Sequence, residues 1–243
     1  MITLSVDELR VAAVVADAAV PSLLDQYATA DAGADDAARR GLVARGLLVA
    51  GTLYPSLAAL LAPLTAPQDV VEYEAVGLRA AQVRDDRGGV TSLVEVEPDI
   101  WRLSTDAAVD AALDAATADL AARPAAPGGP LSLAVDAHLS LLGLLDSPGA
   151  IEGFLVHHLG EDGRRLTDAF ATAGAGRVIH TVRAGDVVTV ERSGWLDGAT
   201  GAWRLDEGDP DDLDARTGFV PCAGSELATT IADVRGLTPA VAA

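Results

Sequence analysis

The first part of the chain shows apolar residues at helical spacing. Residues Ser5–Glu8 have the form of a capping box, in which a hydroxyl and a carboxylate satisfy the first amides of a helix. The helix that follows is expected to end before Pro21, because proline cannot continue it. Further helices are predicted over residues 35–45, which are followed by a glycine, and over 55–64, which begin with a proline.

Further along the chain the hydrophobic period changes to alternation, which is typical of half-buried strands. Apolar residues alternate with glutamates over residues 71–75. Residues 90–97 repeat the alternation, with Glu95 and Glu97 on the polar face, and Asp85–Gly89 provides a turn between two strands. A helix is expected after Thr105. Residues 124–130 contain three prolines and two glycines, so they predict a connector.

The second part of the chain repeats this order of elements. One amphipathic helix, or a pair of helices, is predicted over residues 149–173. Alternating segments bounded by glycine predict strands over 177–183, 186–193, 200–206 and 218–221. A final helix is expected over residues 225–235, with Leu227 and Ile231 on its apolar face.

The repeated order predicts an internal duplication. Trp-Arg-Leu occurs at residues 101–103 and again at 203–205, although the chain contains only three tryptophans. We expect a single domain with an N-terminal half, residues 1–123, a connector, residues 124–130, and a C-terminal half, residues 131–243. The halves are expected to share one sheet around a pseudo-two-fold axis. Its strands should pair mainly antiparallel because their connections are short, which gives an α+β fold.

Composition and charge exclude several classes of protein. Half of the 243 residues are hydrophobic, which is enough for a core and excludes intrinsic disorder. The formal net charge is −19, and all 17 basic residues are arginine. Such an acidic protein repels the phosphates of nucleic acids and anionic lipids, so neither is an expected partner. The acidic start of the chain lacks the basic region of a signal peptide, so we expect a cytoplasmic protein.

One uncharged stretch, residues 46–68, has the length of a membrane span. Pro55 and Pro63 interrupt it, and the longest clean segment, residues 55–64, would cover roughly 15 Å of a hydrocarbon core about 30 Å thick. We therefore interpret this segment as a buried core helix and expect no membrane span.

The residues whose side chains could act in catalysis or bind a metal do not form a recognisable motif. His157 and His158 are neighbours on a predicted helix and point about 100° apart, and no third ligand lies near them in sequence. Cys222 has no histidine beside it and fits a small buried apolar side chain. The acidic residues around Pro210 lack the central glycine and closing glutamate of a calcium loop. We therefore expect no catalytic residue, no metal and no cofactor.

A resemblance to a known family is carried by residues 37–71. A helix ending Leu-x-x-Arg-Gly-Leu is followed by an apolar helix with Leu-x-x-Leu-x-x-Pro and then by a strand; the matching residues are Leu42, Arg45, Gly46, Leu47, Leu61, Leu64 and Pro67. The strand and helix over residues 2–20 and the strand around Trp203-Arg204-Leu205 are also similar. These features resemble the EspG family, cytosolic chaperones of type VII (ESX) secretion, over essentially the whole chain.

The resemblance implies a central antiparallel sheet flanked by two helical bundles, in quasi-two-fold halves. It also implies a protein without enzymatic activity that holds the aggregation-prone helical end of a PPE-type secretion substrate in the cytosol. The family's contact surface includes the sheet and the C-terminal helical part. No contact motif transfers residue by residue to this chain.

A holding chaperone needs an exposed apolar patch for its client and enough charge to stay soluble. The second block of strands and the last helix supply candidates for that patch, which would have an acidic rim: Val178, His180, Val182, Val188, Val190, Leu227 and Ile231. The alternative is that these residues simply pack together as core, and for any single one of them core packing is the favoured interpretation.

Two other functions remain open at this stage. The first is an enzyme of unknown class whose acid and base come from separate strands, such as His180 with Asp186 or Glu191. The second is a scaffold that dimerises through a sheet edge. The identity of the client, the contact residues and the oligomeric state do not follow from the sequence.

Overall fold

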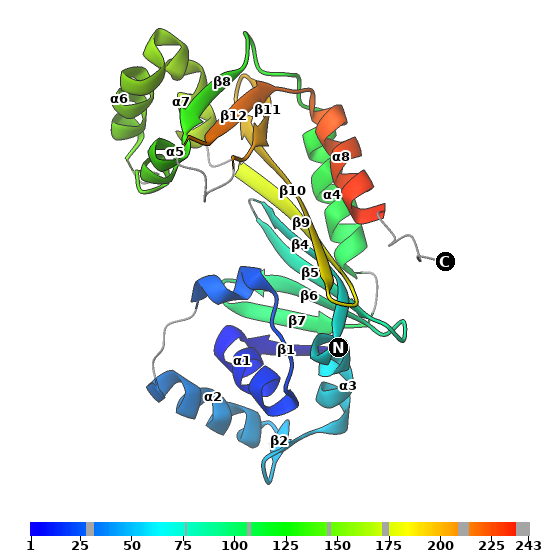
Figure 1. The fold of residues 1–243 in the computed structure, drawn as a ribbon. Coiled ribbons are helices and arrows are strands. Elements are labelled where there is room, and N and C mark those ends of the chain that lie inside the picture. Colours follow the sequence, from blue (N-terminus) through cyan, green and yellow to red (C-terminus); the bar gives the residue numbers. More distant parts are fainter. Residues whose placement is uncertain are drawn as a thin grey trace.

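The computed structural model describes residues 1–27, 32–75, 77–105, 108–144, 147–171, 175–208 and 214–236. Ten strands form one sheet in the order β1-β7-β6-β5-β4-β9-β10-β11-β12-β8, and each neighbouring pair is antiparallel (Figure 1). The strands are β1 (Ile2–Ser5), β4 (Pro67–Ala75), β5 (Leu78–Asp85), β6 (Val90–Glu97), β7 (Ile100–Ser104), β8 (Leu131–Ala134), β9 (Ala175–Ala184), β10 (Val187–Gly198), β11 (Gly201–Asp206) and β12 (Arg216–Pro221). The predicted α+β fold with a central antiparallel sheet is confirmed.

The helices agree with the sequence pattern at most positions. They are α1 (Val6–Ala16), α2 (Ala32–Ala44), α3 (Pro55–Thr65), α4 (Ala108–Ala121), α5 (Val135–Leu142), α6 (Pro148–Leu159), α7 (Arg164–Ala171) and α8 (Gly224–Gly236), with 3-10 turns η1 (Ser22–Tyr27) and η2 (Gly160–Gly163). The capping box at the start of α1 is present, since Ser5 and Glu8 bond each other's backbone amides. The sequence pattern missed β8 and α5, which directly follow the connector.

The uncharged stretch over residues 46–68 does not form one long helix. It folds as a small hairpin of β2 (Leu48–Val49) and β3 (Thr52–Leu53), followed by α3 and the start of β4. None of the helices in the described ranges combines the length and hydropathy that a membrane crossing requires.

Successive residues of the central strands point to opposite faces of the sheet and enter different cores. Ala80 packs in a cluster with residues of α4 and α8, whereas Ala81 packs in a cluster with residues of α1, α2 and α3. In β10, Trp195 belongs to the α4 and α8 cluster, whereas Leu196 belongs to a third cluster with residues of α5, α6 and α7.

The strand register shows that the two helical bundles lie on the same face. Ala81 lies beside Glu72, Glu72 beside Ile179, and Ile179 beside Arg192, which shares its face of β10 with Leu196. We call this face A; it carries α1–α3 at one end of the sheet and α5–α7 at the other (Figure 1). Face B carries α4 and α8 over its middle.

The strand order is palindromic. If β1, β4, β5, β6 and β7 are matched, in this sequence, with β8, β9, β10, β11 and β12, both ends of the sheet have the same order toward the centre. The outermost strands support this match, because Thr3–Asp7 is similar to Ser132–Asp136 and each segment runs from a strand directly into a helix. Trp-Arg-Leu does not, since Trp101 lies on β7 and Trp203 lies on β11, which are not equivalent in this order. The division into two halves around a pseudo-two-fold axis stays a prediction.

The contact between α4 and α8 can be tested with a pair of glycine substitutions. A Cβ on Gly224 would overlap the carbonyl oxygen of Leu120, whereas a Cβ on Gly153, inside α6, would meet nothing within 4 Å. We expect Gly224→Ala to destabilise the fold by about 1–3 kcal/mol through overpacking. Gly153→Ala should stabilise it by about 0.5–1 kcal/mol, because alanine loses less backbone entropy in a helix. Urea unfolding of both variants measures this, and equal effects would contradict the packing of α8 on α4.

Candidate partner-binding surface

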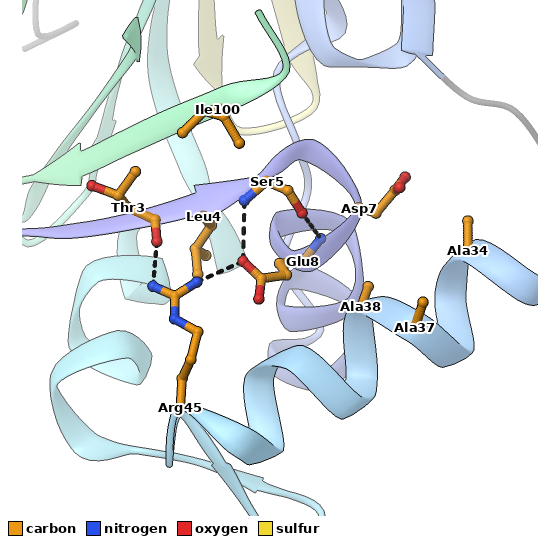
Figure 2. Close-up of a pocket in the computed structure, with 10 residues that line it drawn as sticks. All are labelled: Thr3, Leu4, Ser5, Asp7, Glu8, Ala34, Ala37, Ala38, Arg45 and Ile100. Carbon is orange, nitrogen blue, oxygen red and sulfur yellow. Dashed lines mark hydrogen bonds and ion pairs between the residues drawn. The ribbon is translucent and has the colours of Figure 1, made fainter. Parts of the chain in front are cut away.

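A depression of about 550 Å³ lies between β1 and the starts of α1 and α2 (Figure 2). Two of its charged residues, Glu8 and Arg45, already bond each other. Glu8 Oε2 accepts from the Ser5 amide at 3.1 Å and from Arg45 Nη1 at 2.6 Å. Arg45 Nη2 donates to the Thr3 carbonyl at 2.5 Å. The arrangement fixes α1 and α2 to β1, so we assign it a structural role.

Both outermost strands of the sheet are short, and each has a backbone carbonyl bonded to an arginine. Arg45 bonds Thr3 of β1, and Arg216 Nη2 donates to the Ser132 carbonyl of β8 at 2.8 Å. Thr3 and Ser132 are matched positions in the strand order. Short strands and charged side chains are how proteins keep sheet edges from pairing with other chains.

His180 lies at the centre of the sheet and is 2% exposed. Its Nε2 is 2.8 Å from Asp69 Oδ1, and Arg84 Nη1 is 3.2 Å from the other carboxylate oxygen, so the three side chains link β9, β4 and β5. Glu191 is the register neighbour of His180 on β10, whereas Asp186 lies in the turn of the hairpin. The proposed pairing of His180 with Asp186 or Glu191 is therefore replaced by a buried bond to Asp69.

The other reactive groups do not assemble into a site within the described ranges. Burial raises the pKa of the Cys222 thiol, and its hydrogen bond to Glu226 raises it further, so the thiol stays protonated. No group of three possible metal ligands occurs among the described residues. Asp209, Asp211 and Asp212 of the acidic loop lie outside those residues.

The seven candidate contact residues fall into two groups. Four are buried: Val178, Leu227 and Ile231 in the cluster under α4 and α8, and His180 beside it. Val182 is partly buried, and Val188 and Val190 are 50% and 45% exposed. Val187, which the sequence interpretation did not single out, is 64% exposed. Of these candidates, the ones exposed to a partner thus lie, together with Val187, in the outer half of β10.

A groove of about 220 Å³ opens on face A between the two helical bundles. We call it the central groove; it is lined by Ser22, Arg177, Ile179, Arg192, Ser193 and Glu207. Glu72, beneath it, accepts from the Ser22 hydroxyl at 2.8 Å and from the Leu23 amide at 3.0 Å, which holds η1 across the sheet.

The arginines of the central groove differ in their partners. Arg177 Nη2 is 2.9 Å from Glu74, which also lies 3.2 Å from Arg79 Nε. Arg192, by contrast, forms no ion pair with any residue in the ranges that the structure covers. It is an exposed cation at the rim of the groove, on the same strand as Val188 and Val190. The sequence signal for it was the alternation along that strand, which was interpreted only for its valines.

Strand β10 is longer than the strand beside it. Of its 12 residues, only Gly194–Gly198 pair with β11, whereas Val187–Leu196 pair with β9. On the side away from β9, residues Val187–Ser193 face no strand within the described part of the chain. We call this segment the free edge.

A family model matches residues 5–233 of this sequence, and that model describes the EspG family. The chain belongs to the EspG family. This match, which spans both halves and both helical bundles, confirms the resemblance seen in residues 37–71. A search of curated proteins finds no match.

A solved structure has the same fold as this EspG-family chain. It is that of EspG5 from Mycobacterium tuberculosis, a type VII secretion system chaperone, in complex with a PE25–PPE41 dimer. The alignment covers 98% of this chain and 97% of EspG5, with a TM-score of 0.54 and 14% sequence identity. At this identity, the likeness shows a shared fold.

Burial of His138 makes stability depend on pH. Its ring packs edge-on against Phe219, and burial lowers its pKa below 6.5, with a smaller opposing effect of Glu207. The unfolded chain therefore binds a proton more readily than the folded one, so this contribution is full above about pH 6.5 and is lost as pH falls toward the lowered value. Between about pH 7.5 and 5.5, unfolding free energy should fall more for the wild type than for His138→Gln. Urea unfolding at both pH values measures this. An equal fall of the unfolding free energy in the two proteins would contradict the prediction.

The structural role of His180 predicts a loss of stability on its removal. His180→Ala leaves Asp69 with one partner fewer and opens a gap between the central strands, so we expect about 1–3 kcal/mol of destabilisation in urea unfolding. The exposed His157 on α6 is the control, and His157→Ala should change stability by at most about 0.5 kcal/mol. Equal effects would show that the bond to Asp69 contributes nothing.

Proposed function

We propose that this chain is a non-catalytic, cytosolic chaperone that binds a helical type VII secretion substrate of the PPE class and keeps it soluble. The single observation that carries this proposal is the EspG-family match over residues 5–233. The shared fold with EspG5, a structure that holds a PE25–PPE41 dimer, supports the choice of client.

The surface chemistry is consistent with a holding function. Val188 and Val190 form an exposed apolar strip on face A beside Arg192 of the central groove, and Val187 is exposed on face B of the same strand. The chain as a whole carries a formal charge of −19. Apolar exposure gives a client somewhere to bury its own apolar surface, and net charge keeps the loaded and empty chaperone soluble. We place the client over this strip and the groove, so that the buried candidates Val178, Leu227 and Ile231 support the surface from below.

Co-expression tests this function. The full chain is expressed with each PE–PPE pair encoded in the same genome, and soluble client and co-purification are measured by affinity capture and size exclusion. We expect at least one pair to become soluble and to elute as a complex. If each pair stays insoluble and none co-purifies, the proposed function is wrong.

A matched pair of variants tests the place of binding. Val188→Lys/Val190→Lys puts two charges into the apolar strip, and burying unpaired charges in an interface is costly, so we expect at least about a tenfold loss of client affinity. Val14→Lys on α1 changes an equally apolar residue that is 78% exposed and lies outside the apolar strip and the central groove, and should bind as the wild type. Equal binding by both variants would place the client elsewhere.

A further inference from the structure

The free edge differs from the two outer edges of the sheet. The outer strands β1 and β8 have four residues each, and each has a carbonyl bonded to an arginine. The free edge has seven residues and includes three exposed valines. Proteins usually shorten, charge or cover such an edge, since it is a template for another strand. Among the described residues, the longest unpaired edge of this sheet is therefore the one next to the central groove.

The hairpin geometry fixes which backbone groups point outward. Ala184 and Val187 flank the two-residue turn Gly185-Asp186, with Gly185 at φ +61°, as a type II′ turn requires. The turn bond joins Ala184 and Val187, and hydrogen-bonded pairs alternate along an antiparallel ladder. The amides and carbonyls of Val188, Val190 and Arg192 therefore point away from β9.

The same alternation continues into the paired part of the strand. Gly194, Leu196 and Gly198 have the same parity as Val188 and Val190, and they lie where β10 pairs with β11. The outward groups of the free edge thus continue a line of backbone donors and acceptors that β11 already uses. An added strand would extend that ladder without disturbing β9.

We propose that the free edge binds an extended segment of a partner polypeptide, which adds to β10 as a strand. Backbone bonds to Val188, Val190 and Arg192 would supply affinity, and alternate side chains would supply specificity. On face A the segment would place β-branched residues beside Val188 and Val190 and a carboxylate beside Arg192, the cation without an ion pair in the described residues. The binding site itself does not depend on the proposed function. Only the identification of the partner as a secretion client rests on it.

Charge favours a foreign partner over a second copy. Another copy of this chain would bring its own formal charge of −19 to the edge, and like-charged molecules repel one another. Locally the edge is balanced, with Glu191 on face B and Arg192 on face A. A segment with one acidic and one basic residue on opposite faces complements it.

A peptide probe tests the edge without any client. We would titrate the full-length, 15N-labelled chain with the capped peptide Thr-Glu-Lys-Val-Thr-Val-Thr, which in antiparallel register sets its glutamate opposite Arg192 and its valines opposite Val190 and Val188. We expect amide shifts confined to Val187–Ser193 and the neighbouring β9, with slowed hydrogen exchange at Val188, Val190 and Arg192. Shifts elsewhere, or none at about 1 mM peptide, would overturn the proposal.

Proline separates backbone pairing from side-chain contact. The same peptide with proline in place of its first valine lacks one strand amide and should bind at least about tenfold more weakly. In the protein, Val190→Pro removes an outward amide and should have the same effect, whereas Val190→Thr keeps the amide and should bind within about threefold. Equal binding of the two peptides would overturn strand addition. The peptide pair decides the question even if Val190→Pro does not fold.

The client complex separates this proposal from the proposed function. With a PE–PPE pair that the wild type captures, Val190→Pro should lose at least about tenfold in affinity and Val190→Thr should not. Capture that is insensitive to proline would overturn strand addition by the client and leave the chaperone function standing. If the wild type captures no pair, the proposed function fails, and the peptide titration still decides whether the free edge binds a strand.

The oligomeric state of the chain alone tests the other occupant. If the chain elutes as a dimer and Val190→Pro abolishes that dimer, the edge belongs to a second copy and the proposal is overturned.

Discussion

The antiparallel ladder between β4 and β9 is the interaction on which the rest of the structure depends. It joins residues Asp69–Ala75 to Gly176–Val182 and thereby makes one sheet out of two sets of five strands. Val71 and His180 lie opposite each other in it, and both are buried. Because this ladder fixes the distance between the two helical bundles, it also fixes the central groove that lies between them.

Much of this architecture could be predicted from the sequence, because alternation and helical spacing are local. The strands β4, β6, β9 and β10 and the helices α1, α3 and α8 follow directly from them. The short β8 and α5 have too few residues for their period to stand out. The antiparallel sheet followed from short connections, whereas its palindromic order depends on long-range pairing. The two-fold relation between the halves stays a prediction.

The candidate surface was less accessible to sequence reasoning. Valines at alternate positions of β9 and β10 predict strand faces, but the pattern does not say which faces another helix covers. Val178 is covered by α8, whereas Val188 is exposed on the part of β10 that continues past the end of β11. His180 looked like a possible base in the sequence, and only the register showed Asp69 beside it. Lateral neighbours come from distant parts of the chain, so local periodicity cannot supply them.

The two outer edges of the sheet also limit how the molecule can grow. The outer strands have four residues each and a carbonyl bonded to an arginine, so they provide few free backbone groups for pairing with another strand. At the inner end of β10, β11 already occupies the edge. Within the described residues, a strand joining this sheet would find a long free edge in one place, the seven residues Val187–Ser193. Strand addition at the free edge would therefore stop at one-to-one stoichiometry, and this ten-stranded sheet would not grow into open-ended fibres.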